Sequence, residues 1–171
     1  MQSRSSALTR TSIITSLFIA ACAAGAAGQG KEVAPEDLAK GAEVVAVGRV
    51  SGLVSRWSTD HSRIYTTVTL SVDQYMKGGS AGAPLNILVA GGEVDGVGEV
   101  YSHTATFKKD EDVLVFAEKD REGKYRVTRG QQGKFSVHRD EATGKAFVGT
   151  RPMDDVATAV RKAIGVSIQK Q

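Results

Sequence analysis

Three histidines are the side chains of this chain that could hold a metal ion or act as a general base. His61 lies in a polar loop beside Asp60, whereas His103 and His138 lie near predicted strands. Their spacing matches neither HxH nor HExxH, the patterns that bring two imidazoles onto one metal ion. Cys22 is the only cysteine, which excludes cysteine-based zinc sites and a thiol nucleophile in the folded part. We therefore predict no catalytic residue, no metal site and no cofactor.

A glycine-rich segment, GGEVDGVGE (91–99), is the second candidate for chemistry because it carries Glu93 and Asp95. It lacks the alternating oxygen ligands and the terminal glutamate of an EF-hand calcium loop. It is not a phosphate-binding loop either, because GK[ST] is missing and a strand follows in place of a helix. No GxSxG motif occurs, and Ser136 has no basic residue at a spacing that would indicate a base for a serine nucleophile. We interpret the segment as a solvated, flexible loop.

A loop after the first long predicted strand (55–63) is the best candidate for recognition. It holds the only tryptophan, Trp57, among charged residues, a combination that is common in protein interfaces. The alternative is that Trp57 folds back as a plug over one barrel end, since large aromatic side chains are mostly buried. The predicted binding surface joins this loop to the glycine-rich one and comprises Arg56, Trp57, Asp60, His61, Arg63, Glu93 and Asp95.

The elements that must position these residues are predicted to be strands. Apolar or threonine side chains occupy every second position from Ile64 to Val72. This period of two predicts a strand with one buried face and one wet face. In the valine-rich segment before it (43–54), Gly48 and Gly52 indicate a bulge or a bend. Further short strands are predicted at 85–90, 103–107, 113–118, 124–129, 133–139 and 144–149. Many short strands with regular turns are typical of a closed barrel or a sandwich.

The segments that flank the strands have helical patterns. At the far end, apolar side chains recur at helical spacing at Met153, Val156, Ala157, Val160 and Ile164. Acidic residues begin this stretch, basic residues end it and a glycine follows, in agreement with the macrodipole and C-cap rules. We expect this helix to pack on the barrel. Before the strands, Pro35 predicts a short helical turn, PEDLAK (35–40).

The first 28 residues have the pattern of a secretory signal: a polar start with two arginines, an apolar run (13–21) and small residues. The run is shorter than the roughly 20 residues that span a bilayer, so it is not a transmembrane anchor. Residues 19–22 (IAAC) resemble the lipobox of bacterial lipoproteins, in which the cysteine becomes the lipidated first residue. Ordinary cleavage after the small residues at 24–28 is the alternative, and it discards Cys22 with the leader.

The predicted organisation is a signal peptide (1–21), a tether (22–41), a β-barrel domain (42–150) and a C-terminal helix with a tail (151–171). The chain has 22 basic and 19 acidic residues. Cleavage of the signal peptide would remove two arginines and no acidic residue. The exported part therefore has a formal charge of +1, which argues against nucleic acid as a partner. With one cysteine it has no intrachain disulfide, so its core alone must stabilise it.

Several segments, taken in order, resemble an uncharacterised family of exported bacterial β-proteins. They are VVAVGRV (44–50), VDQYMKG (72–78), LNILV (85–89), GGEVDG (91–96), FKKDEDVLVFAE (107–118) and YRVTRGQQGKFSV (125–137). The GGE turn and the terminal QGKF are the more specific parts of this pattern. The resemblance implies an architecture and no active site.

More distantly, the order of strands is similar to that of netrin-type modules and the inhibitory domain of tissue inhibitors of metalloproteinases. Lys77 and Gly78 stand where those domains have a strand that runs into lysine-glycine, and VLVF (113–116) stands at their later strand. Those inhibitors place a disulfide-held N-terminal cysteine on the protease zinc. Cys22 has no partner cysteine, so the resemblance implies only the barrel. The predicted fold class is all-β: an OB-like β-barrel or strongly curved sheet with one C-terminal α-helix.

These features predict an exported, lipid-anchored envelope protein that acts as a non-catalytic protein-binding module. We expect it to lie at the outer membrane or to face the periplasm if Cys22 is lipidated, and otherwise to be periplasmic or secreted. Its expected partner is another envelope or secreted protein, with the membrane contacted through the anchor. Two alternatives stay open: a metal-dependent hydrolase that uses the scattered histidines and acidic residues, and a structural component of the envelope.

Overall fold

The computed structural model describes residues 33–165. The predicted signal peptide, Cys22 and the tether up to residue 32 lie outside the described residues. The strands are β1 (Val44–Trp57), β2 (Ile64–Lys77), β3 (Leu85–Ala90), β4 (Gly92–Val94), β5 (Val97–Glu99), β6 (Asp112–Lys119), β7 (Tyr125–Val127), β8 (Lys134–Arg139), β9 (Ala146–Val148) and β10 (Arg151–Pro152). The helical elements are α1 (Pro35–Gly41), the 3₁₀ turn η1 (Gly130–Gly133) and α2 (Met153–Ala163). In this part of the chain, no helix has both the length and the apolar character needed to cross a bilayer.

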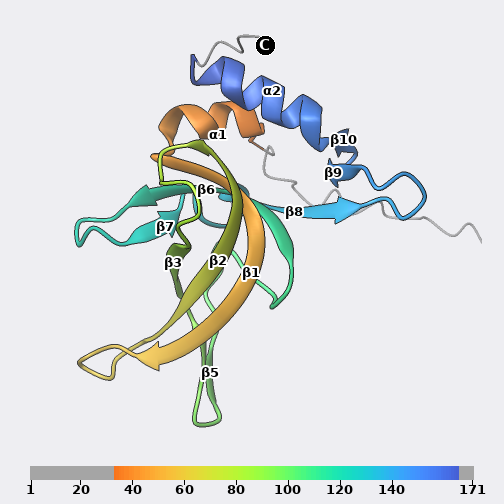
Figure 1. The fold of residues 1–171 in the computed structure, drawn as a ribbon. Helices are drawn as coiled ribbons and strands as arrows, with labels where there is room; N and C mark the ends of the chain where they lie inside the picture. The colour runs from red at the N-terminus through yellow and green to blue at the C-terminus, as the bar shows by residue number, and fades with distance from the viewer. Residues whose placement is uncertain (1–32, 166–171) are drawn as a thin grey trace, which may run out of the picture. The chain divides into compact units, whose positions relative to one another are not determined.

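Five strands close into a barrel in the order β1-β2-β3-β7-β6, and β6 pairs back onto β1 (Figure 1). β3 and β7 run parallel, whereas the other pairs in the ring are antiparallel. Beyond β6 the sheet continues through β8, β9 and β10, and α2 follows directly. A five-stranded barrel of this kind is OB-like. The prediction of an all-β, OB-like barrel with a C-terminal helix is therefore confirmed.

β1 and β2 form a hairpin that belongs to the barrel at one end and projects from it at the other (Figure 1). Up to Arg49, β1 pairs with both β2 and β6; beyond it, β1 pairs with β2 alone. The register shifts at Gly48 and Gly52, where the sequence predicted a bulge or bend. A Cβ at Gly48 would lie 2.3 Å from the carbonyl oxygen of Ser71, so the two backbones approach more closely here than any side chain permits.

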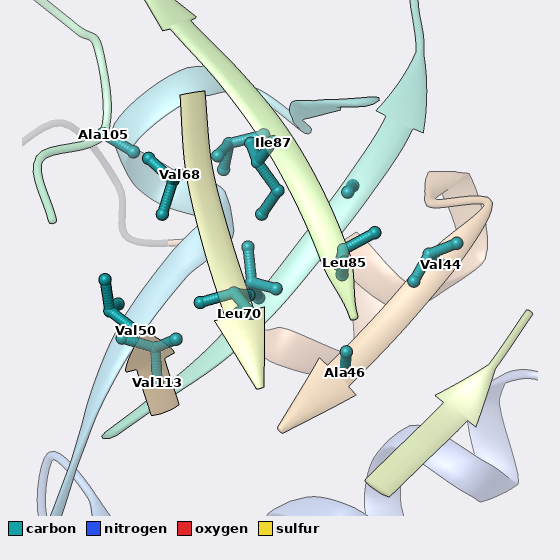
Figure 2. Close-up of a cluster of buried hydrophobic side chains, with 12 residues drawn as sticks. Val44, Ala46, Val50, Val68, Leu70, Leu85, Ile87, Ala105 and Val113 are labelled. Atoms are coloured by element: carbon teal, nitrogen blue, oxygen red, sulfur yellow. The ribbon is translucent and has the colours of Figure 1, made fainter. Parts of the chain in front are cut away.

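The apolar side chains form two cores, one on each face of β6. The first lies among the barrel strands and includes Val68, Leu70 and Ile87 (Figure 2). The second packs the opposite face of β1 and β6 against α1 and α2. Val113 and Val115 belong to the first core, whereas the intervening Leu114 and the neighbouring Phe116 belong to the second. β6 is therefore covered on both faces, which explains its unbroken apolar sequence.

The position of α1 differs from the predicted domain boundary, which placed residues 22–41 in a tether. Leu38 and Ala39 of α1 are fully buried in the second core, and α1 packs against α2. A bidentate ion pair joins Glu36 of α1 to Arg151 of β10, with a shortest distance of 2.8 Å. Residues 35–41 form the predicted helical turn, but they belong to the folded domain and not to a tether.

Two other segments differ from their predictions. Residues 103–107 form no strand; Ala105 and Phe107 still contact the first core, but the backbone of His103 binds Gln131 of η1 in place of a neighbouring strand. The glycine-rich segment 91–99 is not a flexible loop, because most of it forms the β4–β5 hairpin. Side-chain alternation predicted which faces are buried, but it did not predict these contacts between distant segments.

Candidate functional site

The β4–β5 hairpin and the end of the β1–β2 hairpin both project from the barrel on the side away from α1 and α2 (Figure 1). A hollow of about 450 Å³ lies at their base, and we call it the apolar hollow. One wall comes from β1, β2 and β3, and the other comes from residues 91–107. The hollow therefore depends on segments that lie far apart in the sequence.

Apolar side chains form much of this hollow, and two of them are exposed to solvent. Val68, Val89 and Phe107 line it and also contact the first core. Leu53 on β1 is 38% exposed, and Val100, just after β5, is 95% exposed. Large exposed apolar side chains around a concave surface are typical of binding sites.

Glu99 attaches the β4–β5 hairpin to the barrel. Its Oε2 accepts hydrogen bonds from the backbone N–H of Ile64 at 2.8 Å and from the hydroxyl of Tyr101 at 2.9 Å. The hydrogen bond to Glu99 raises the pKa of Tyr101 above its ordinary value. Nearby, the hydroxyl of Thr66 donates to the carbonyl of Gly91 at 2.7 Å. These bonds hold one wall of the apolar hollow in place.

Replacing Glu99 with alanine is expected to loosen the hairpin and to lower the free energy of unfolding by about 1–2 kcal/mol, because two donors lose their acceptor. Hydrogen exchange should then speed up at the β4 and β5 amides more than in the barrel. Glu93→Ala is the matched control, since Glu93 lies on the same hairpin and its side chain has no hydrogen bond to another residue within 33–165. Equal exchange in the two variants would show that Glu99 does not anchor the hairpin.

A second hollow, of about 590 Å³, lies between the β1–β2 loop (58–63) and the β6–β7 turn, and we call it the polar hollow. Its barrel wall comes from Tyr65 of β2, Leu88 of β3 and Arg126 of β7. Adjacent pairing of β2 with β3 and of β3 with β7 brings these three residues together. The remaining lining is hydroxyl, carboxylate and basic side chains from the two loops.

Asp60 holds the β1–β2 loop in one conformation. Its Oδ1 accepts hydrogen bonds from the hydroxyl of Ser58 at 2.6 Å and from that of Ser62 at 2.8 Å. The backbone N–H of Ser62 also donates to Oδ1, at 3.2 Å. Hydrogen bonds from Ser58 and then Ser62 lower the pKa of Asp60 to about 2, so this carboxylate is ionised at neutral pH. Asp60 therefore organises the loop as well as lining the hollow.

Arg126 is fixed on the opposite side of the polar hollow. Its Nε donates to Oδ2 of Asp120 at 2.9 Å, and its Nη1 donates to the carbonyl of Leu88 at 3.3 Å. The guanidinium lies over the ring of Tyr65, 5.3 Å from its centroid. The hydrogen bond from Arg126 lowers the pKa of Asp120 below its ordinary value. Arg63, in contrast, lines the hollow with no side-chain hydrogen bond or ion pair to another described residue.

The predicted binding surface is divided between separate places. Asp60 and Arg63 line the polar hollow, whereas Glu93 lines the apolar hollow. Asp95 lies in the turn between β4 and β5 with a φ of 52°, and Arg56 is exposed on β1. The loops 55–63 and 91–99 meet at their bases, but their charged residues do not form one continuous site.

Trp57 ends β1 and is partly buried, with its ring stacked on that of His61 at a centroid distance of 6.3 Å. It belongs to neither core, so the interpretation as a plug over the barrel end is wrong. The other two histidines have different neighbours. His138 on β8 stacks on Phe147 of β9, and His103 lies in the loop after β5. Within residues 33–165, no three histidine, cysteine, aspartate or glutamate side chains are grouped to hold a metal ion.

The sequence did not predict a polar cluster around Glu111, the residue that precedes β6. Lys134 of β8 forms an ion pair with Glu111, and the hydroxyl of Ser136 donates to the same carboxylate oxygen at 2.6 Å. Lys134 Nζ also lies 3.1 Å from Ser136 Oγ and 5.6 Å from the centroid of the Phe107 ring. Ser136 thus has a basic partner, contrary to the prediction. Because Glu111 accepts from both groups, the cluster pairs charges and does not arrange the lysine as a base for the serine.

The Lys134 side chain is only 12% exposed. Residues two positions apart on a strand point to the same face, so the spacing of Lys134 and Ser136 could have indicated that their side chains are neighbours. The acidic partner comes from another segment, Glu111, and no local pattern identifies it.

The chain matches no protein-family model and no curated protein. Its resemblances to exported bacterial β-proteins and to netrin-type modules therefore stay predictions from the sequence.

Proposed function

We propose that this chain is an exported envelope protein, lipid-anchored through Cys22, that binds another envelope or secreted protein through the apolar hollow. The observation that supports this most directly is the exposure of Leu53 and Val100 at the rim of a concave apolar surface. Burying one such side chain fully contributes about 1.5–3 kcal/mol to association. A monomer gains nothing from this exposure, whereas a partner that covers both residues gains affinity.

The surroundings of the hollow suit a protein partner. Its floor is apolar, while Glu93, Thr104 and Thr106 supply polar groups around it. An apolar centre with a polar rim is the usual anatomy of a protein interface. A volume of about 450 Å³ accommodates a few apolar side chains of the partner. The wall held by Glu99 is formed before binding, which lowers the ordering cost of association.

Site-specific photo-crosslinking in the native envelope tests this proposal. A crosslinker at Val100 of the full exported chain should capture one stoichiometric protein partner, whereas a crosslinker at Val54 should not. Val54 is also exposed on β1, but it does not line the hollow. The mass of the N-terminal peptide in the same sample distinguishes lipidated Cys22 from ordinary cleavage. Capture of the same proteins from both positions, or of none, would refute docking at this hollow.

Leu53→Asp is expected to weaken binding of the captured partner by about tenfold or more, because a charge would be desolvated inside an apolar interface. Val54→Asp places the same charge on the next residue, on the other face of β1, and should leave affinity within about twofold. Affinity is measured with purified proteins, and the melting temperature is recorded for each variant. Equal losses in the two variants would indicate a general charge effect.

A further inference from the structure

We propose that the polar hollow is a second ligand site and that it binds an acidic oligosaccharide. It is separate from the proposed protein-binding surface, because no residue lines both hollows. Its position is defined by the β1–β2 loop, the β6–β7 turn and the faces of β2 and β3. On OB-like barrels, these loops and this face bind oligonucleotides or oligosaccharides. The side chains present must decide between the two classes.

The charges of the hollow oppose an oligonucleotide. Asp60 and Glu122 line it, and Asp120 lies directly behind Arg126. A phosphodiester backbone carries one negative charge at every nucleotide, so its binding needs a clear excess of basic side chains, which these carboxylates cancel. A saccharide with an isolated acid group needs only one unpaired cation. Single-stranded nucleic acids also need exposed aromatic faces for base stacking. The Arg126 guanidinium lies over the ring of Tyr65, so this face is not available to a base.

The same groups suit sugar rings. Carboxylates, serine and threonine hydroxyls and guanidinium groups match the many donors and acceptors of a saccharide. The hydrogen bonds of Asp60 and Arg126 fix both sides of the hollow before a ligand arrives, so little ordering is needed on binding.

Arg63 favours a saccharide that carries carboxylates. Arg126 and Lys124 have carboxylate partners, Asp120 and Glu122, at 2.9 Å each. The Arg63 guanidinium lines the same hollow without such a partner among residues 33–165. An unpaired guanidinium provides a forked pair of donors that matches one carboxylate in bidentate geometry. We therefore assign Arg63 as the residue that recognises the acid group of the ligand.

Calorimetric titration of the full exported chain tests the assignment with two acidic tetrasaccharides and their neutral counterparts. The probes are a cellotetraose that carries one terminal glucuronate against its methyl ester, and a tetrasaccharide of alternating N-acetylglucosamine and N-acetylmuramic acid against chitotetraose. At least one acidic probe should bind about tenfold more tightly than its counterpart, as expected for one added charge-assisted hydrogen-bonded pair. Failure of both acidic probes, or tighter binding of a single-stranded oligonucleotide or an acidic peptide, would overturn the proposal.

Arg63→Ala should remove this preference for the acidic probe, whereas Arg63→Lys should keep only part of it, since lysine lacks the forked geometry. Arg56→Ala is the matched control, because Arg56 is an exposed arginine on the same hairpin that does not line the hollow. An equal loss in Arg56→Ala would mean that binding follows net charge and not this site. Backbone amide shifts at 58–65 and 122–126 on titration locate the ligand independently, and shifts confined elsewhere would also overturn the assignment.

Discussion

Replacing Gly48 with alanine is expected to lower the free energy of unfolding by about 3 kcal/mol, at the upper end of the usual cost of overpacking. The added Cβ would lie 2.3 Å from the carbonyl oxygen of Ser71 and 2.9 Å from the Cα of Val72. Both are backbone atoms of β2, so no rotamer change relieves the clash. β1 bends at this position while it pairs with β2 on one side and with β6 on the other. The alanine must therefore separate strands of the closed ring.

Gly52 on the same strand provides the control. A Cβ there would lie 3.7 Å from the Cβ of Thr69, an ordinary van der Waals contact. Gly52→Ala should therefore be neutral or should stabilise by about 0.5 kcal/mol, through lower entropy of the unfolded chain. Urea unfolding of both variants measures the difference. A similar cost at the two positions would show that the close approach at Gly48 is not what bends the barrel.

Lys134→Met is expected to cost about 3 kcal/mol, because it leaves the carboxylate of Glu111 without its cationic partner in a largely buried place. The exposed pair of Lys124 and Glu122, at 2.9 Å, is the matched comparison. Lys124→Met should cost at most about 1 kcal/mol, since solvent screens that pair. Similar losses in the two variants would contradict the distinction between a buried and an exposed pair.

The cost of Lys134→Met should depend on pH. Burial raises the pKa of Glu111, but hydrogen bonds from Lys134, Ser136 and the Lys108 N–H outweigh it and hold the pKa below its ordinary value. A lowered folded-state pKa contributes stability above the unfolded value, near pH 4, and this contribution is lost as the pH falls through the folded value. The difference between wild type and variant should therefore narrow below about pH 4. A difference that stays constant from pH 7 to about pH 3 would exclude this linkage.

The sequence predicted the local features of the fold well. The alternation from Ile64 to Leu70 gave the buried face of β2, and LNILVA (85–90) corresponds to β3. Helical spacing predicted α2, which begins at Met153, the first apolar residue of that pattern. These features depend on periodicity along one segment, which a sequence states directly.

The features that were predicted wrongly depend on contacts between segments that lie far apart in the sequence. The glycines of 91–99 suggest flexibility, but the carboxylate of Glu99 accepts from Ile64, a residue 35 positions earlier, and this fixes the hairpin. The candidate site was predicted in part for the same reason. The loop containing Asp60 and Arg63 lines the polar hollow, but no sequence pattern marks Arg126 on β7 as its partner there. No pattern marks Leu53 on β1 as part of the apolar hollow either.

The packing of α1 on α2 has a consequence for the order of events during synthesis. The second core contains Leu38 near one end of the described chain and Val160 near the other. A ribosome releases the N-terminus first, so this core stays incomplete until residues close to 160 have emerged. Ring closure through β6, which pairs with β1 more than 60 positions away, is delayed in the same way. A nascent chain of this protein therefore stays incompletely folded for most of its synthesis. An incompletely folded chain is the form that a protein-conducting channel can pass.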